Sequence, residues 1–153
     1  MFWLTRIRSH SMAPALPDGR LALTRRLWRR TPVRRGDVVV VQSRELGQAV
    51  VKRVIGLPGE TVRIEAGRVS IDGRALAEPY AAPSVFSDRY RVPPGHYFLL
   101  GDHRDKSSDS RSWREPYIER AALIGKLVGR GVSYPVPSGT PVPMITELPS
   151  ARC

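Results

Sequence analysis

A chain of 153 residues with 41% hydrophobic side chains is long enough for one domain with a sizeable core, which excludes a disordered protein. Lys and Arg number 25 against 14 Asp and Glu, and the resulting formal net charge of +11 favours anionic partners such as nucleic acid or a membrane surface. The single cysteine excludes an internal disulfide, and no apolar run approaches the roughly 20 residues that a membrane-spanning helix needs.

The chain has the short apolar runs and two-residue alternation of β-strands. In chain order, strands are predicted at residues 20–24, 37–42, 48–55, 61–65, 68–71, 96–100 and 123–128. The valine-rich run 37–42 (DVVVVQ) is typical of a strand that is buried on both faces.

Turn signals separate these strands. Ala66-Gly67 and Asp72-Gly73 predict tight hairpin turns. Residues 77–88 are rich in Pro, Ala and Ser and predict an irregular segment, and a helical turn is expected around residues 115–122. We expect a mainly β domain at residues 1–130, built of twisted antiparallel sheets in a barrel-like arrangement, and a flexible, irregular Pro-rich tail at 131–153.

Three segments fit no simple element. Ser9 and Ser11 alternate within residues 9–14 (SHSMAP), so both hydroxyls can point to one side of an extended backbone. Lys52 interrupts an apolar strand, and a desolvated lysine has a lowered pKa that lets it accept a proton near neutral pH. Residues 101–111 (GDHRDKSSDSR) form an almost wholly polar run directly after an apolar strand.

Each segment also has a purely structural interpretation. The two serines suit a turn, and residues 101–111 suit a surface loop with Asx and Ser turns. Lys52 is followed by Arg53, and strand alternation would turn one of the two toward solvent. Only the presence of all three segments, in this order, indicates a specific chemistry.

Together the segments resemble the type I signal peptidases, the Ser-Lys proteases that remove signal peptides. That family places its nucleophile in S-x-S-M-x-P, matched by residues 9–14, and its lysine at the start of K-R-x-x-G-x-P-G-[DE], matched by 52–60. Its G-D-N-R-x-N-S-x-D-S-R segment is matched by residues 101–111 at nine of eleven positions. The two exceptions are His103 and Lys106, where the family usually has asparagine.

The resemblance implies the catalytic roles. Ser11 would be the nucleophile and Lys52, kept neutral by apolar strand neighbours, its general base. Ser107 would orient the lysine amine. The backbone N–H of Ser11 and the hydroxyl of Ser9 would form the oxyanion hole.

Further roles follow from the same resemblance. Asp109 and Arg111 would form an ion pair that holds the loop of Ser107, and Asp102 would cap or brace that loop. The substrate would be an exported preprotein with a small-x-small (A-x-A) site, bound as an added β-strand. The candidate residues for its pockets are Ile7, Met12, Leu16 and Val51. No cofactor is expected, and no metal, because His10, His96 and His103 lack ligand spacing.

The family implies a cell-membrane location, on the extracytoplasmic face. Its members usually carry one or two spanning helices before the nucleophile, but ten residues precede Ser11 here, so we expect either a missing upstream segment or an unanchored paralogue. An anionic membrane surface is a further candidate partner, through an arginine cluster that consists of Arg25, Arg26, Arg29, Arg30, Arg34 and Arg35.

Alternative functions stay open. One is a Ser-Lys protease with a single dedicated substrate or with self-cleaving activity. Another, of a different class, is a catalytically silent basic module that binds membrane or nucleic acid, with nucleic acid the less favoured partner. The arginine cluster also suits a plain solvated loop.

Overall fold

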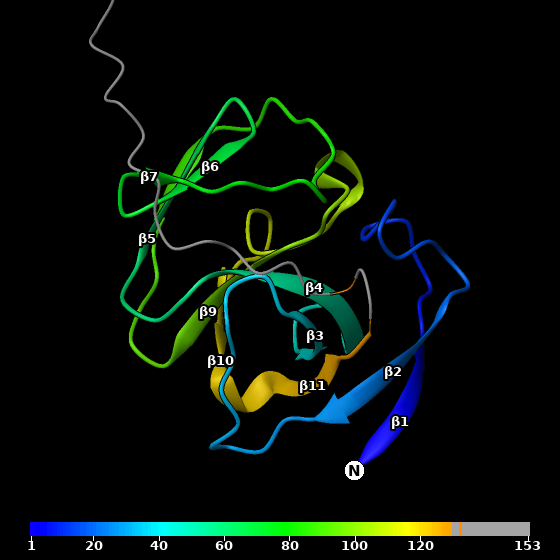
Figure 1. Cartoon of the computed structure of the whole chain (residues 1–153). Coiled ribbons are helices and arrows are strands. Elements are labelled where there is room, and N and C mark those ends of the chain that lie inside the picture. Colours follow the sequence, from blue (N-terminus) through cyan, green and yellow to red (C-terminus); the bar gives the residue numbers. More distant parts are fainter. Residues whose placement is uncertain (130–131, 133–153) are drawn as a thin grey trace, which may run out of the picture.

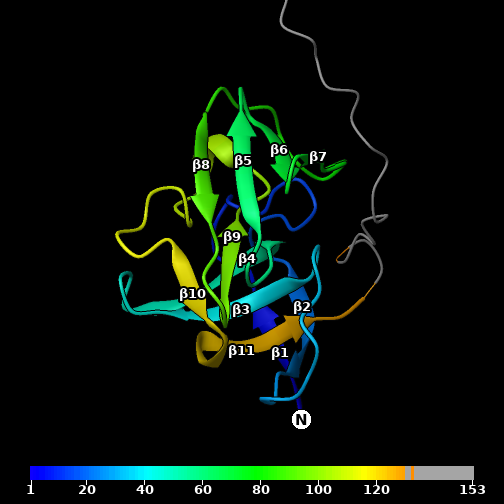
Figure 2. The ribbon, with the colours of Figure 1, turned by 90° about the vertical axis from the view of Figure 1, so that its left-hand side faces the viewer.

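The computed structural model describes residues 1–129 and residue 132. Within this part of the chain, eleven strands form two antiparallel sheets, joined where β4 leads into β5 (Figures 1 and 2). Two single-turn 3-10 helices, η1 (Arg104–Lys106) and η2 (Arg120–Ala122), lie in the connections. The mainly β, antiparallel class predicted from the sequence is confirmed.

The larger sheet has seven strands in the order β1-β2-β11-β3-β4-β9-β10. Among the described residues its end strands, β1 and β10, do not pair with each other, so the sheet is open and not a closed barrel. Its strands are β1 (Phe2–Arg6), β2 (Leu21–Arg26), β3 (Val38–Ser43), β4 (Gln48–Gly56), β9 (His96–Leu100), β10 (Tyr117–Glu119) and β11 (Leu123–Leu127).

The smaller sheet has four strands in the order β7-β6-β5-β8. Ala66 and Gly67 both have positive φ in the β5–β6 turn, and Asp72 and Gly73 do so in the β6–β7 turn. This is the conformation that a two-residue type I′ hairpin requires, so both predicted turns are confirmed. The strands are β5 (Thr61–Glu65), β6 (Arg68–Ile71), β7 (Arg74–Ala75) and β8 (Asp88–Arg91).

The valine-rich strand β3 lies at the centre of the larger sheet and is buried on both faces, as its composition predicted. Its four valines are at most 4% exposed. Val38 and Val40 pack in one apolar cluster with Ile7, Met12 and Leu16, whereas Val39 and Val41 pack in another. Strand alternation therefore makes β3 the wall between two parts of the core.

Several elements differ from the sequence prediction. The helical turn expected around residues 115–122 is only the short η2, because Tyr117–Glu119 pairs with β9 as strand β10. Strands β1, β7 and β8 were not predicted. Val132, within the expected tail, is 2% exposed and packs in the cluster of Met12, so domain packing extends at least that far. Residues 133–153 lie outside the described part of the chain.

Candidate active site

Ser11 lies in the turn that follows β1. Hydrophobic burial holds this turn in place: Met12 and Leu16 are fully enclosed, Ile7 is nearly so, and Leu16 N–H donates to the Met12 carbonyl oxygen at 2.9 Å. The Ser11 residue itself is 6% exposed. The apolar residues of this segment therefore anchor a hydroxyl that lies just beneath the surface.

Lys52 extends from β4, which pairs with β3 on one side and β9 on the other. Its Nζ lies 3.0 Å from Ser11 Oγ and 3.2 Å from Ser107 Oγ. The three side chains come from positions 11, 52 and 107, one in each of the three segments that the sequence singled out. The fold thus brings all three segments together at one amine.

The surroundings of Lys52 lower the pKa of its amine. The pKa of Lys52 is lowered from 10.5 to about 8, chiefly by burial and in part by the positive charge of Arg111. The negative charges of Asp109 and Asp102 act in the opposite direction but are outweighed. A substantial neutral fraction therefore exists near neutral pH, which a general base needs.

Ser9 stands beside Ser11 on the exposed side of the site. Its Oγ lies 3.0 Å from Ser11 Oγ, and the Ser11 N–H donates to it at 3.4 Å. The two groups expected to hold an oxyanion are therefore adjacent. Here the Ser11 N–H donates to the Ser9 hydroxyl oxygen. A substrate oxygen would replace this contact and accept hydrogen bonds from both groups.

Gly101 permits the close packing of the polar loop on the turn of Ser11. A Cβ at position 101 would lie 2.1 Å from Ser107 Oγ and 2.7 Å from the carbonyl oxygen of Ser11. Such distances exclude any side chain. The loop is tied to the turn by the N–H of His103, which donates to that same Ser11 oxygen at 2.9 Å.

Asp109 and Arg111 support this loop from within. Arg111 Nε and Nη2 donate to the two carboxylate oxygens of Asp109, each at 2.9 Å. Asp109 also accepts the N–H of Gly101 at 3.0 Å, and Arg111 donates to the Arg104 carbonyl oxygen. The pair therefore connects both ends of the segment that carries Ser107.

The partner of Asp102 was not anticipated. Asp102 does not cap its own loop but binds Arg53, the neighbour of Lys52, through two hydrogen bonds of 2.7 Å. Both side chains are fully buried. The expectation that one of Lys52 and Arg53 faces solvent is thus wrong, because Arg53 is neutralised inside the protein. Both residues stand in matched motifs, but no pattern within the sequence pairs them.

The residues expected to contact substrate differ in accessibility. Ile7, Met12 and Leu16 are at most 2% exposed and belong to the core beneath Ser11. Val51 is partly exposed and packs against the same cluster. Of the four side chains, Val51 is the one with open surface beside Lys52.

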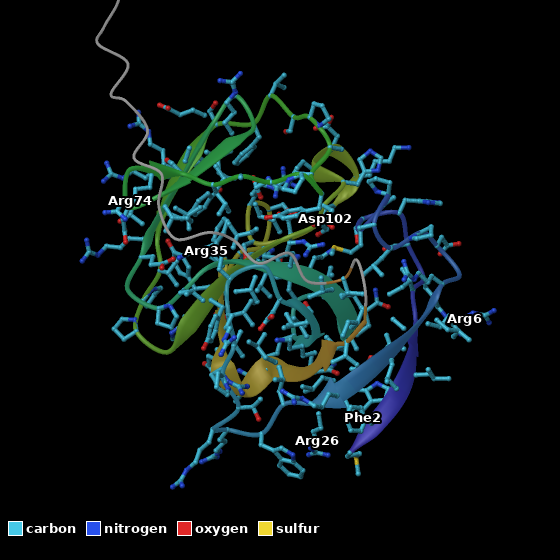
Figure 3. The ribbon with its side chains drawn as sticks, viewed as in Figure 1. Phe2, Arg6, Arg26, Arg35, Arg74 and Asp102 are labelled. Atoms are coloured by element: carbon cyan, nitrogen blue, oxygen red, sulfur yellow. The ribbon has the colours of Figure 1, made fainter. Side chains whose placement is uncertain are left out.

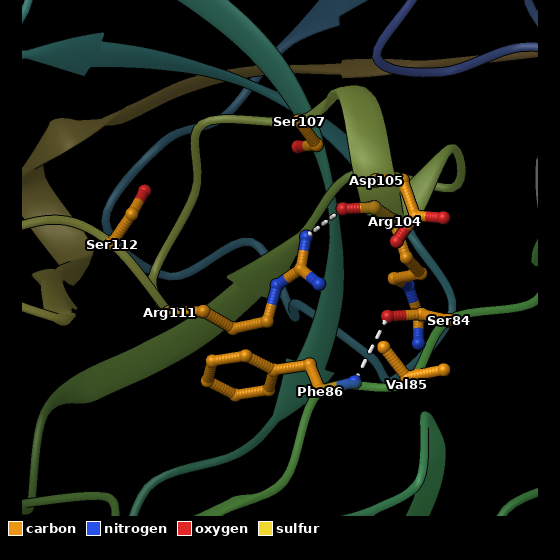
Figure 4. A pocket seen from close by; sticks show the side chains of 8 residues that line it. All are labelled: Ser84, Val85, Phe86, Arg104, Asp105, Ser107, Arg111 and Ser112. Atoms are coloured by element: carbon orange, nitrogen blue, oxygen red, sulfur yellow. Dashed lines mark hydrogen bonds between the residues drawn. The ribbon is translucent and has the colours of Figure 1, made fainter.

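A shallow cavity of about 330 Å³ adjoins the site on the side of Ser107. Figure 4 shows it between the chain around Phe86 and the loop that carries Arg104 and Arg111. The guanidinium of Arg111 lies over the Phe86 ring, 5.5 Å from its centre. The surface beside Ser107 is therefore hollowed and lined by both apolar and cationic groups.

Comparisons with known proteins agree on the family. A family model described as "Signal peptidase, peptidase S26" matches residues 1–131. A signal peptidase I from Leptolyngbya laminosa is 39% identical over 135 residues, which cover 81% of this chain and 66% of that protein. The probable signal peptidase I-1 of a Synechocystis strain is 41% identical and is covered to 68%, again with 81% of this chain.

The fold comparison gives the same answer. The crystal structure of a signal peptidase I from Enterococcus faecalis V583 superposes with a TM-score of 0.58 at 32% sequence identity, covering 64% of this chain and 98% of that one. The chain belongs to the signal peptidase family, peptidase S26. It spans about two thirds of the length of the curated relatives described above. Among the described residues, no helix has the length and apolar character needed to cross a membrane.

Proposed function

We propose that this chain is a serine endopeptidase that removes N-terminal signal peptides from exported preproteins. The observation that carries the proposal is the 3.0 Å approach of a buried lysine amine, with its pKa lowered to about 8, to the hydroxyl of Ser11. A serine hydroxyl becomes a useful nucleophile when a neighbouring base takes its proton. Lys52 supplies that base, with Ser107 holding the amine in line.

Acylation follows from this geometry. Ser11 Oγ bonds to the carbonyl carbon of the scissile peptide while its proton passes to Lys52 Nζ. The C–N bond then breaks, and the leaving amine departs with that proton. The developing oxyanion is bound by the Ser11 N–H and the Ser9 hydroxyl, and such a donor contributes about 2.7–4 kcal/mol in other proteases.

Deacylation uses the same groups in reverse. A water molecule gives a proton to the neutral Lys52 amine and adds to the ester carbonyl carbon. The bond to Ser11 Oγ then breaks, and Oγ takes the proton back from Lys52. Throughout both steps, the buried Arg53–Asp102 pair holds the strand of Lys52, and the Asp109–Arg111 pair holds the loop of Ser107.

The substrate is expected to bind as an extended strand with a small-x-small sequence before the cleaved bond. Ile7, Met12 and Leu16 form the packed floor beneath Ser11, and Val51 offers the exposed apolar contact. A floor that is already filled leaves room only for small side chains above it. This accounts for an A-x-A preference without a deep pocket.

We further propose that the protein acts at the extracytoplasmic face of the cell membrane, on an anionic lipid surface. Phe2, Leu4, Leu21, Leu23 and Trp28 are exposed, each by at least 44%. A cavity of about 380 Å³ beside them is lined by Met1, Phe2, Arg25, Arg26, Trp28, Arg30, Thr31 and Pro32. Apolar and cationic side chains together suit the boundary between lipid head groups and acyl chains.

Not every arginine of the arginine cluster is available to bind lipid. Arg35 makes two hydrogen bonds with Glu60 and another with the Ile55 carbonyl oxygen, so it braces the junction of the sheets (Figure 3). Arg26 lies over the Trp28 ring, with its guanidinium carbon 4.7 Å from the ring centre. Arg25, Arg29, Arg30 and Arg34 are exposed and available to lipid phosphates.

The test of the catalytic proposal is substitution of each dyad residue. Ser11→Ala and Lys52→Met should each abolish cleavage of an A-x-A preprotein, while circular dichroism shows an unchanged fold. The double variant should be no worse than either single one, because the two residues act as a unit. Exposed Ser87→Ala is the matched control. Cleavage above a tenth of the unmodified rate in either variant would refute the assignment.

A further inference from the structure

The nucleophile is preceded by a free sheet edge. β1 is the terminal strand of the larger sheet and pairs only with β2 among the described strands. Ile7 donates its N–H to the Arg20 carbonyl oxygen and accepts the N–H of Gly19, each at 2.8 Å, so both its backbone groups face the β2 side. Alternation along a strand turns the backbone groups of Arg6 and Arg8 toward the open edge.

The side chains alternate in the same way. Ile7 is directed into the core, whereas Arg6 and Arg8 are exposed. Figure 3 shows the Arg6 side chain reaching away from the body of the protein beside β1. A strand added to this edge places alternate side chains on the two faces. Its inward residues would lie on the side of Ile7, and its outward residues on the side of the two arginines.

The charges of both arginines are unopposed within the described part of the chain. Neither the Arg6 nor the Arg8 side chain makes a hydrogen bond or ion pair with any of the described residues. The nearest residues along the chain, His10 included, add no negative charge. Two guanidinium groups without an ion-pair partner among the described residues therefore stand on the segment that leads to Ser11.

We propose that Arg6 and Arg8 determine specificity at the middle position of the small-x-small site, where they favour an acidic side chain and disfavour a basic one. The two small residues face inward toward the filled floor, so the middle residue faces outward beside the arginines. Arg8 adjoins Ser9, at the point where the scissile carbonyl is held, and makes the larger contribution. This inference rests on the proposed function, because it assigns a preference to that same cleft.

The test uses three soluble peptides with the sites A-E-A, A-Q-A and A-K-A, assayed without vesicles. The full chain should cleave the glutamate peptide with a kcat/KM about 2- to 5-fold above the glutamine peptide, as expected for one exposed ion pair, and the lysine peptide most slowly. Arg8→Gln should bring the ratios toward one, and Arg6→Gln with Arg8→Gln should bring them closer still. The readout is the ratio of the A-E-A and A-K-A rates to the A-Q-A rate within each variant, because a merely structural role would change all three rates alike.

Arg74→Gln is the matched control, since Arg74 is equally exposed but lies in the smaller sheet (Figure 3). It should leave all three rates unchanged. Equal cleavage of the three peptides by the unmodified chain, or ratios that persist in the double variant, would overturn this proposal alone. A double variant that keeps the ratios but loses binding to anionic vesicles would assign the arginines to lipid instead. If no peptide is cleaved, the proposed function fails and this inference fails with it.

Discussion

Arg53 and Asp102 form a fully buried, bidentate ion pair that ties the strand of Lys52 to the loop of Ser107. Arg53 Nη1 also donates to the carbonyl oxygens of Gly36 and Val132, at 2.9 and 2.8 Å. Its guanidinium lies over the Tyr80 ring, 4.0 Å from the centre. The pair therefore joins β4 to the loop of Ser107, to the segment of Tyr80 and to the end of the described chain.

Breaking this pair should be strongly destabilising. Asp102→Asn leaves the Arg53 charge uncompensated in the interior, and loss of one partner of a buried pair costs about 3–5 kcal/mol. Urea unfolding monitored by circular dichroism measures the change. Glu65→Gln, which removes the exposed pair with Arg63, is the control and should change little. Equal unfolding midpoints for the two variants would contradict a structural role of Asp102.

The pH profile of activity should report Lys52. Because burial lowers its pKa to about 8, the neutral fraction grows as pH rises toward 8 and levels off above it. We expect kcat/KM for an A-x-A peptide to increase nearly tenfold per pH unit below about pH 7.5 and to plateau near pH 9. A profile that is flat from about pH 6 to 10, with the fold intact, would rule out a lysine base.

The same buried amine should cost stability. The folded-state pKa of Lys52 lies near 8, below the ordinary value of 10.5, so between these values the unfolded chain binds more protons. The free energy of unfolding therefore rises with pH in this window. Below pH 8 the full cost of burying the protonated Lys52 amine applies. Lys52→Met should stabilise the protein by on the order of 3 kcal/mol at pH 7 and by much less near pH 10.5.

Denaturant unfolding at the two pH values measures this difference. Lys106→Met, at an exposed lysine of the loop that carries Ser107, is the control and should show no such pH dependence. A gain from Lys52→Met that is the same at both pH values would mean that packing, and not removal of a buried charge, explains it.

Gly101→Ala should separate positioning of Ser107 from its chemistry. The new methyl group would lie 2.1 Å from Ser107 Oγ, so the loop has to shift away from Lys52. We expect kcat to fall at least as far as in Ser107→Ala, with KM little changed. Gly125→Ala on β11, where a methyl group would lie 2.7 Å from Thr24 and Trp3, tests the general effect of such crowding. Normal kcat in Gly101→Ala would show that the contact between Ser107 and Lys52 is dispensable.

Vesicle binding should depend on the exposed arginines. Simultaneous Arg25→Ser, Arg29→Ser and Arg30→Ser should weaken binding to anionic vesicles by about 100-fold, since each arginine contributes about 1 kcal/mol near such a surface. Binding by the unmodified chain should weaken as salt rises, and nucleic acid should compete for the same charges. Serine at Arg63, Arg68 and Arg74 in the smaller sheet is the matched control. Cosedimentation that is equal for anionic and neutral vesicles would contradict the proposal.

Much of the fold followed from local patterns. The valine run 37–42 and the turns at Ala66-Gly67 and Asp72-Gly73 are specified by burial and by backbone preference, so they could be predicted. Strand β8 (DRYR) could not, because three of its four residues are charged and only pairing with β5 makes it a strand. Likewise Tyr117–Glu119 extends because it pairs with the edge of β9.

The sequence by itself determined the family, the residue types of the site and the order of the three segments. Each of these can be read from short contiguous motifs, which do not depend on contacts between distant residues. Only the tertiary structure decided that Lys52 and Arg53 are both buried. A lone strand would turn one of them to water, but here Asp102, 49 residues away, neutralises Arg53. Contacts at such separations depend on how the sheets pack, and so does the desolvation that lowers the pKa of Lys52.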